Sequence, residues 1–304
     1  MDAKINRISE KLFLITLFPP ISGFDDFIGV WLYKGTKTFI VDVGPSVTVK
    51  TLINALDKLN VKKLDYILLT HIHLDHAGGI GEIASLFPKT PIVCHEKGVS
   101  HLVDPGRLLE GTIKTLGATG KAYGPIKSVF KAQLVDADKF LSDSVNAVIT
   151  PGHSPHHVSY ATDKYLFAGE AGGVVIALPS GRIYMRPATP HRFILDVSIK
   201  SIDALIDIDP LTICYGHFGI QNEAVKMLKM HKNQILLWEE IINSEINNNK
   251  KNFLSICLEK LFEKDPMLSG FHLLDKSQQK RELVFIENSI TGFTKYLQAV
   301  ANNL

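Results

Sequence analysis

The chain has 304 residues, 45% hydrophobic and 21% charged, which suffices for a sizeable core and fits one large α/β domain with an appended segment. A formal net charge of +2 argues against nucleic acid and anionic membranes as partners. Three cysteines without a CxxC pair indicate buried free thiols, and the lack of a signal-peptide pattern or of a run of ~20 apolar residues leads us to expect a cytoplasmic protein.

The N-terminal third alternates between two kinds of apolar pattern. Short aromatic and β-branched runs predict strands, and spacing with the helical period predicts helices. The expected strands are residues 11–18, 29–33, 38–44, 66–69 and 91–94. The expected helices are residues 47–59 and 77–86. Lys34-Gly35 suits the turn of a hairpin between the second and third strands.

The middle third is less regular. Six glycines among apolar residues over 97–131 favour a helix and loops rather than sheet. Four further strands are expected at residues 133–135, 146–150, 157–160 and 165–168. A Gly/Pro-rich excursion over 171–197 precedes a helix at 198–208 and a strand at 211–215.

After Gly219 the pattern becomes helical and we expect no further strand. Helices are predicted over 220–247, 251–264 and 275–302, with a polar linker at 247–252. Residues 221–304 hold 11 Lys plus Arg against 10 Asp plus Glu, which favours a packed helical cap over a nucleic-acid arm. We therefore divide the chain into an α/β domain, residues 1–219, and a helical C-terminal extension packed on it, residues 220–304.

The strongest chemical signal is Thr70-His-Ile-His-Leu-Asp-His-Ala-Gly-Gly79, directly after a buried strand. Histidine and carboxylate are the preferred ligands of borderline divalent metals such as zinc. In an extended loop, the alternate residues His71, His73 and Asp75 would point the same way. Asp75 and His76 would then begin the next helix, where a carboxylate is also favoured.

Three further segments repeat this placement, each after an apolar strand. They are Pro151-Gly152-His153, Gly169-Glu170 and Gly216-His217. Glycine before a ligand-type residue is expected where the backbone must bend sharply toward a metal pocket. Each segment alone is a weak signal, but all four motifs in one chain are a strong one.

The motifs HxHxDH, PGHSPHH, LFAGE and YGHFG resemble those of the metallo-β-lactamase superfamily over about residues 10–219. The resemblance implies a four-layer αββα sandwich with metals in a cleft at one edge. It implies one metal bound by His71, His73 and His153, a second bound by Asp75, His76 and His217, and a bridge at residue 170. Asp75 would also orient the nucleophile, and Asp42, in a matching Asp-x-Gly element, would support a ligand from outside.

Glu170 departs from the family pattern, which usually has aspartate there. The extra methylene lets its carboxylate reach further, so we favour a bridging Glu170 over a mononuclear site. We expect two divalent ions, zinc before iron or manganese. His156 is expected to support the ligands from outside, and His157 to be structural.

Substrate contacts are less well defined by the sequence. Tyr184 and Arg186 follow Glu170 in the excursion and could clamp an acidic or polar group, although a solvated surface loop is an equal alternative. Arg107 and Tyr123 lie in the glycine-rich segment, which could form a lid.

The function expected is hydrolysis of a small ester, thioester or lactone by a metal-bound hydroxide, with a layout that resembles the glyoxalase II-like group. A phosphodiesterase or RNase of the same fold is the first alternative, although the balanced charge argues against an RNase. An iron oxidoreductase similar to persulfide dioxygenases and a non-catalytic binding protein are the others. The expected partner is a small molecule rather than a membrane or nucleic acid, and a homodimer stays open.

Overall fold

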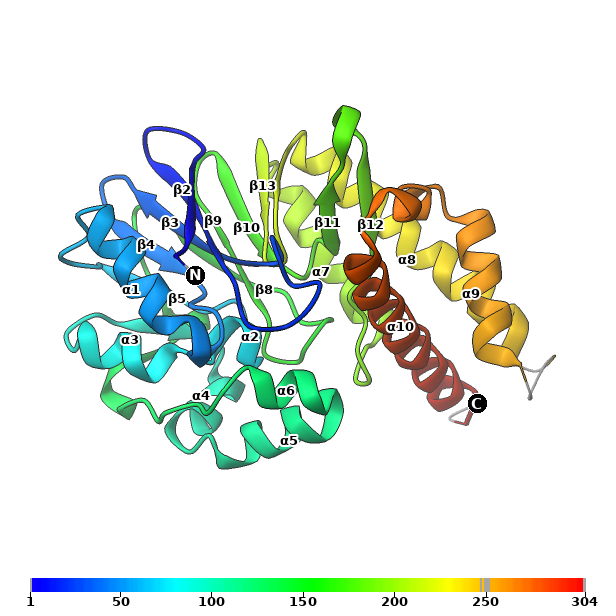
Figure 1. The fold of residues 1–304 in the computed structure, drawn as a ribbon, viewed down its shortest axis with the longest axis horizontal. Helices are drawn as coiled ribbons and strands as arrows, with labels where there is room; N and C mark the ends of the chain where they lie inside the picture. Colours follow the sequence, from blue (N-terminus) through cyan, green and yellow to red (C-terminus); the bar gives the residue numbers. More distant parts are fainter. Residues whose placement is uncertain (1, 247, 249–251, 303–304) are drawn as a thin grey trace.

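A seven-stranded sheet from the N-terminal half is the first of two central layers in the computed structural model, which describes residues 2–246, 248 and 252–302 (Figure 1). Its strands follow in chain order: β1 (Lys4–Arg7), β2 (Leu12–Leu17), β3 (Ile28–Lys34), β4 (Thr38–Val41), β5 (Tyr66–Leu68), β6 (Ile92–Cys94) and β7 (Leu134–Asp136). Strands β1 to β4 form an antiparallel meander, and β4 to β7 run parallel, joined by helical crossovers.

The second layer is a five-stranded mixed sheet. Its spatial order is β14 (Ile220–Asn222), β13 (Thr212–Tyr215), β10 (Tyr165–Gly169), β9 (Val158–Ala161) and β8 (Asn146–Ile149). Only β10 and β13 pair in parallel within the described sheet. A separate hairpin, β11 (Val174–Ala177) and β12 (Ile183–Arg186), follows β10.

Alternating side chains of the central strands define the layers. In β4, Phe39 and Val41 face the second sheet, where they meet Phe167, while Ile40 faces the helices on the other side. Successive residues of a strand point to opposite faces, so these apolar strands are buried on both. This arrangement confirms the predicted four-layer αββα sandwich.

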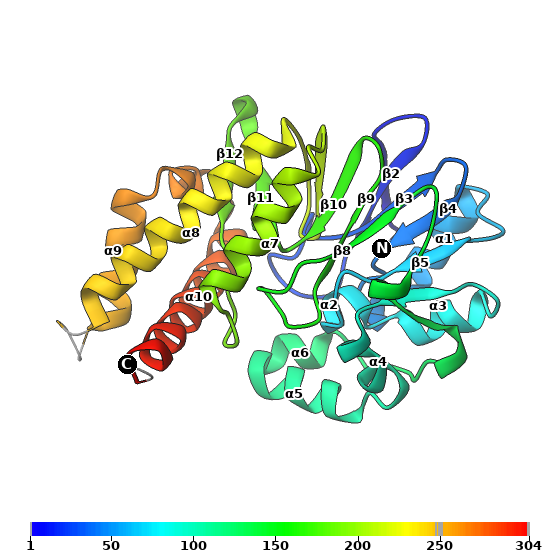
Figure 2. The ribbon, with the colours of Figure 1, turned by 180° about the vertical axis from the view of Figure 1, so that it is seen from behind.

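Helices cover the two outer faces of the sandwich (Figures 1 and 2). The first sheet is covered by helices from the N-terminal half: α1 (Val49–Lys58), α2 (Leu74–Ala77), α3 (Ile80–Leu86), α4 (Glu96–Val103), α5 (Gly106–Leu116) and α6 (Ala118–Ala122). The second sheet is covered by α7 (Leu195–Asp207) and α8 (Ala224–Ile246), and α9 (Phe253–Lys264) and α10 (Lys276–Asn302) pack against α8 beyond the β11–β12 hairpin.

The C-terminal helices share one apolar core with the second sheet and the hairpin. Leu166 of β10 and Val175 of β11 belong to the same buried cluster as Trp238 of α8 and Phe293 of α10. Figure 1 shows the β11–β12 hairpin between the sandwich and helices α8 and α10. The predicted helical C-terminal region is therefore present, and its division from the rest at residue 219 stays a prediction.

Several local predictions were wrong or incomplete. Residues 220–222 form strand β14, although no strand was expected after Gly219, because they pair with β13 despite a polar Gln-Asn sequence. The excursion over 171–197 contains the β11–β12 hairpin and the start of α7. Residues 97–131 hold three helices rather than one, and β1 was not anticipated.

Some expectations fall at the limits of the described chain. Residue 247 of one predicted helix, residue 251 of another, and residues 247 and 249–251 of the polar linker lie outside the described residues. Within the described chain, no helix combines the length and apolarity that crossing a bilayer requires. The three cysteines are free and buried, as predicted.

Candidate metal centre

The seven side chains singled out in the four motifs meet at one edge of the sandwich. Each follows the end of a strand, or starts the helix after it, so the topology delivers all of them to the same edge. They form two groups of close donor atoms: His71, His73, His153 and Glu170 in the first, and Asp75, His76 and His217 in the second.

The first group surrounds a point that one ion could occupy. The Nδ1 atom of His73 lies 2.9 Å from Nε2 of His71 and 3.1 Å from Nε2 of His153. The Oε2 atom of Glu170 lies 2.9 Å from Nε2 of His153 and 3.3 Å from Nε2 of His71. Tetrahedral zinc with bonds of 2.0–2.1 Å would hold its ligands about 3.3 Å apart. The spacing therefore fits a tetrahedral divalent ion.

The second group lies on the other side of Glu170. Nε2 of His76 and Nε2 of His217 are 3.3 Å apart, and Oδ2 of Asp75 is 3.4 Å from Nε2 of His217. The two oxygens of Glu170 reach this group as well, with Oε1 3.5 Å from His217 Nε2 and Oε2 3.6 Å from His76 Nε2. The glutamate carboxylate thus lies between the two groups, at the place where a bridging ligand would be needed.

Hydrogen bonds outside the cluster fix the tautomers of its histidines. Asp42 accepts from Nδ1 of His76 at 2.8 Å and from the backbone N–H and hydroxyl of Thr70. The Thr70 hydroxyl oxygen lies 3.0 Å from Nδ1 of His71 and can accept from it. Both rings are thereby held with Nε2 toward the centre, which is the nitrogen that can bind a metal once it is unprotonated.

Backbone carbonyls serve two other histidines in the same way. Nδ1 of His153 lies 3.0 Å from the carbonyl oxygen of Ala188, and Nδ1 of His217 lies 3.4 Å from that of Phe27. The Phe27 ring also stacks on the His217 ring, with centroids 4.2 Å apart and planes 9° apart. These contacts hold both rings with Nε2 toward the cluster.

Burial keeps most of these imidazoles neutral. It lowers the pKa of His73 to about 3 and that of His217 to about 4, so both are unprotonated lone-pair donors at neutral pH. Burial alone would also lower the pKa of His76, but the surrounding carboxylates outweigh it and raise the pKa to about 9. An excess of lone pairs and carboxylates around one buried point favours a bound cation.

Two backbone positions are adapted to this crowding. Asp42 has a φ of +59°, a conformation that L-residues other than Asn and Asp rarely adopt. Gly169, with a φ of +55°, lies so close to the His157 ring and to Thr70 that an added Cβ would be 2.9 Å from the Thr70 Cβ. Only glycine fits there, and it turns the chain so that Glu170 enters the cluster.

His157, which we expected to be structural, holds Glu170 in place. Its Nε2 accepts a hydrogen bond from the backbone N–H of Glu170 at 3.1 Å, and its Nδ1 lies 2.9 Å from the Thr150 hydroxyl. The ring is fully buried. The third histidine of PGHSPHH was the only sequence signal for this role, and nothing in the sequence linked it to Glu170.

The two residues that were expected to clamp the substrate make contacts inside the protein instead. Tyr184 and Arg186 are both buried, and Nε of Arg186 donates to Oε2 of Glu282 on α10. Arg281 donates to the other oxygen of Glu282 at 2.8 Å and to the carbonyl of Gly23. The result is a buried Arg–Glu–Arg triad that ties β12 and the β2–β3 loop to the last helix.

The triad is linked through Phe27 to His217, one of the seven clustered donor residues. The Arg281 guanidinium carbon lies 3.9 Å from the centre of the Phe27 ring, the same ring that stacks on His217. Both groups lie about 4 Å from one ring centre, so they must occupy its opposite faces. Helix α10 therefore supports a residue of the candidate centre from outside.

The remaining candidates lie around the centre rather than within it. His156 is bonded to the Ser154 hydroxyl at 3.0 Å, with its ring centroid 5.9 Å from that of His73. Tyr123 is buried, and its hydroxyl has no hydrogen-bond partner among the residues that the structure describes. Arg107 is exposed on α5. The segment expected as a lid is thus helical, with Tyr123 packed in the core.

Comparison with known proteins agrees with this architecture. The Metallo-beta-lactamase superfamily profile matches residues 25–217, which is more than half of the chain. A metallo-beta-lactamase fold-containing protein from Sulfurisphaera tokodaii is 28% identical over 239 residues, covering 73% of this chain and 84% of that protein. A hydroxyacylglutathione hydrolase from Pectobacterium atrosepticum is 26% identical over 202 residues, covering 65% of this chain and 64% of the relative.

Solved structures give the same fold. The crystal structure of an archaeal metallo-beta-lactamase superfamily protein from Sulfolobus tokodaii aligns with a TM-score of 0.64 at 23% identity, covering 90% of this chain and 99% of that one. A metallo-beta-lactamase family protein from Thermus thermophilus aligns with a TM-score of 0.64 at 18% identity, covering 97% of this chain and 95% of that one.

Proposed function

Because the chain belongs to the metallo-beta-lactamase superfamily and is thus a metallo-hydrolase, we propose that it cleaves a small ester, thioester or lactone. The observation that supports this most is the convergence of seven donor atoms in two groups around Glu170. The separations between these donor atoms suit two divalent ions, each with a tetrahedral or near-tetrahedral arrangement of ligands.

The proposed ligands divide as the motifs do. The first ion would be held by His71, His73 and His153, the second by Asp75, His76 and His217, and the carboxylate of Glu170, which lies between the two groups, would serve both. An all-nitrogen and oxygen set without thiolate suits zinc, with iron and manganese as alternatives. Bound metals would supply an activated water at neutral pH and would stabilise negative charge on the substrate oxygen.

The protein's own groups provide orientation and exclude water. Asp75 is the least buried of the carboxylates, with 13% of its side chain exposed, and we assign it the orientation of the nucleophile in addition to metal binding. Asp42 holds the His76 ring, and His157 holds the backbone of Glu170. Side chains fixed in this way need no rearrangement during the reaction.

The relatives favour a thioester among the small substrates. Several proteins named hydroxyacylglutathione hydrolase are 26–29% identical to this chain. The aligned part spans 64% of the Pectobacterium and Salmonella relatives and 47% of the Buchnera relative, so their substrate transfers here only as a proposal.

A substrate panel on metal-reconstituted protein tests this function. We expect hydrolysis of thioesters and small esters and none of bis(p-nitrophenyl) phosphate, with activity lost in His153→Ala and kept in His191→Ala, a change at an exposed histidine. Phosphodiester cleavage without thioester cleavage would instead identify a phosphodiesterase. Iron in the purified protein with oxygen consumption would identify an oxidoreductase, and no turnover after reconstitution would indicate a binding protein.

A further inference from the structure

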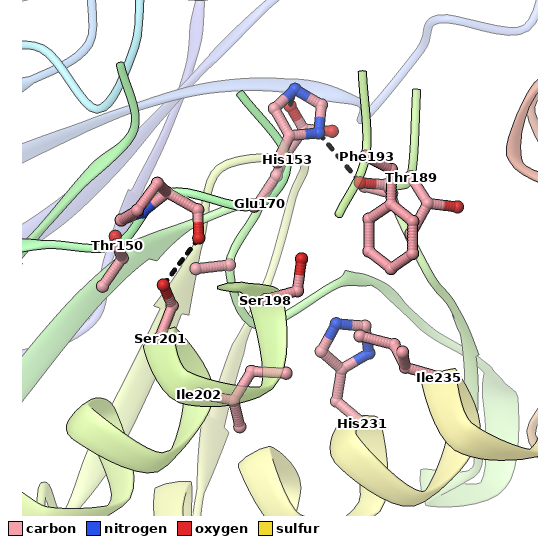
Figure 3. A pocket seen from close by; sticks show the side chains of 14 residues that line it. Thr150, His153, Glu170, Thr189, Phe193, Ser198, Ser201, Ile202, His231 and Ile235 are labelled. Carbon is pink, nitrogen blue, oxygen red and sulfur yellow. Dashed lines mark hydrogen bonds and ion pairs between the residues drawn. The ribbon is translucent and has the colours of Figure 1, made fainter. Parts of the chain in front are cut away.

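A narrow cavity lies beside the metal cluster, between the strand-end loops and helices α7 and α8 (Figure 3). His153 and Glu170 form its side nearest the cluster. It encloses about 280 Å³ including its open mouth, but the space between its inner walls takes only about one water-sized group. A group in this cavity would therefore lie against two of the seven proposed metal ligands.

The inner wall of the cavity is apolar at three positions. Phe193, Ile202 and Ile235 line it and are buried, with 1–3% of each residue exposed. Figure 3 shows Ile202 on α7 and Ile235 on α8 on the side away from Glu170. They limit how far a chain that enters past Glu170 can extend.

The polar groups of the wall are uncharged and mostly occupied. The hydroxyl of Ser198 donates to the carbonyl of Ile194 at 3.1 Å. The hydroxyl of Ser201 donates to the carbonyl of Pro151 at 2.6 Å (Figure 3). Apart from Glu170 of the metal cluster, no acidic, Lys or Arg side chain lines the cavity in the described part of the chain. A charged group entering it would have no counter-charge.

His231 contributes the remaining polar group. Figure 3 shows its ring rising from α8 toward Ser198. Its Nδ1 is buried and has no hydrogen-bond partner among the described residues, and burial lowers the pKa of the ring to about 4. The imidazole is therefore neutral at pH 7, with unused hydrogen-bonding capacity and no charge to offer.

We propose that this cavity is the subsite for the acyl chain of the substrate, and that it selects a short, uncharged chain. The proposal rests on the proposed hydrolase function and specifies its substrate class. With the scissile carbonyl at the proposed metal site, the methyl group of a two-carbon acyl chain would fill the space, while each added methylene would press on Ile202 or Ile235. A chain ending in a carboxylate would lose its hydration without finding a cation.

A series of p-nitrophenyl esters with one leaving group tests the proposal. In the zinc-loaded protein we expect kcat/KM for the acetate to exceed that for the butyrate by about 10-fold or more, and the hemisuccinate to be cleaved still less. Ile202→Ala should reduce the acetate-to-butyrate ratio by about 10-fold, and the milder Ile202→Val should reduce it less. Ile208→Ala, at the exposed C-terminal end of the same helix, is the matched control and should leave the ratio unchanged.

Binding of product-like anions gives a readout that does not need turnover. The binding of acetate, butyrate and hexanoate to the zinc-loaded protein is measured by titration calorimetry. Ile202→Ala or Ile202→Val should raise the affinity for butyrate and hexanoate relative to that for acetate. If no ester is cleaved but this shift in binding occurs, the hydrolase assignment fails and the subsite stands. Equal preference for all chain lengths, or ratios unaffected by both Ile202 variants, would overturn the subsite.

Discussion

Replacement of Glu282 by glutamine should destabilise the protein strongly, because Glu282 is the single anion between two buried guanidinium groups. Arg186, Arg281 and Glu282 are each at most 5% exposed. Breaking a buried ion pair typically costs about 3–5 kcal/mol, because an uncompensated charge remains inside. For a chain of 304 residues that corresponds to a fall in melting temperature of roughly 5–8 °C.

The same substitution should weaken the metal centre from a distance. Once residue 282 carries no negative charge, we expect the Arg281 guanidinium to move away from the Phe27 ring. That ring supports His217 by stacking. Loss of such outer support typically lowers metal affinity about 10–100-fold, and we expect the lower figure because the contact is indirect. Thermal unfolding of the metal-free protein and competition with a chromophoric zinc chelator measure the two effects separately.

Glu287→Gln, five residues further along α10, is the matched control. It makes the same chemical change on the same helix, outside the triad, and should change the melting temperature by less than about 2 °C. If the Glu282→Gln variant had the melting temperature of the wild type, the charge on Glu282 would not contribute to the stability of the fold, and the argument from the geometry of the triad would be refuted. If it melted early but bound zinc normally, the link from α10 to His217 would be refuted.

Three further predictions concern the immediate surroundings of the centre. Asp42→Asn removes the carboxylate that orients His76 and should lower zinc affinity about 10–100-fold in chelator competition; unchanged affinity would exclude that role. Gly169→Ala should cost about 1–3 kcal/mol in urea unfolding, whereas Gly111→Ala, in a helix with open space around it, should stabilise by about 0.5–1 kcal/mol; equal effects would refute the steric argument. His231 is neutral in the fold but binds a proton once unfolded, so its contribution to stability is lost as pH falls from 6.5 toward its folded pKa of about 4. His231→Leu should therefore lose about 3 kcal/mol less stability than wild type between pH 7 and pH 4, and parallel curves would contradict this.

The sequence was most informative where a residue's role depends on its position along the chain. The expected metal ligands each follow an apolar strand, so local pattern and topology together bring them to one edge. The periodicities predicted individual strands and helices, whereas the sandwich that they form was implied by the resemblance of the motifs. Motifs and periodicities depend only on neighbouring residues, so they can be recognised in the sequence without knowledge of the tertiary contacts.

The sequence was least informative where a role depends on a distant partner. Glu282 looks like a solvated charge on an amphipathic helix, yet it pairs with Arg186, 96 residues earlier in the chain. Arg186 was expected near the substrate for the same reason, since nothing local shows that an anion meets it. His157 has its role because Gly169 brings the chain back against its ring. Tertiary contacts of this kind leave no periodic trace.

Zinc stoichiometry after reconstitution of the metal-free protein tests the central claim most directly. Elemental analysis should give two zinc ions per wild-type chain and one in His217→Ala, which leaves His71, His73 and His153 intact. The exposed control His191→Ala should keep two. A wild-type value of one would refute the binuclear centre and the bridging Glu170, and a value near zero would refute the metal site itself.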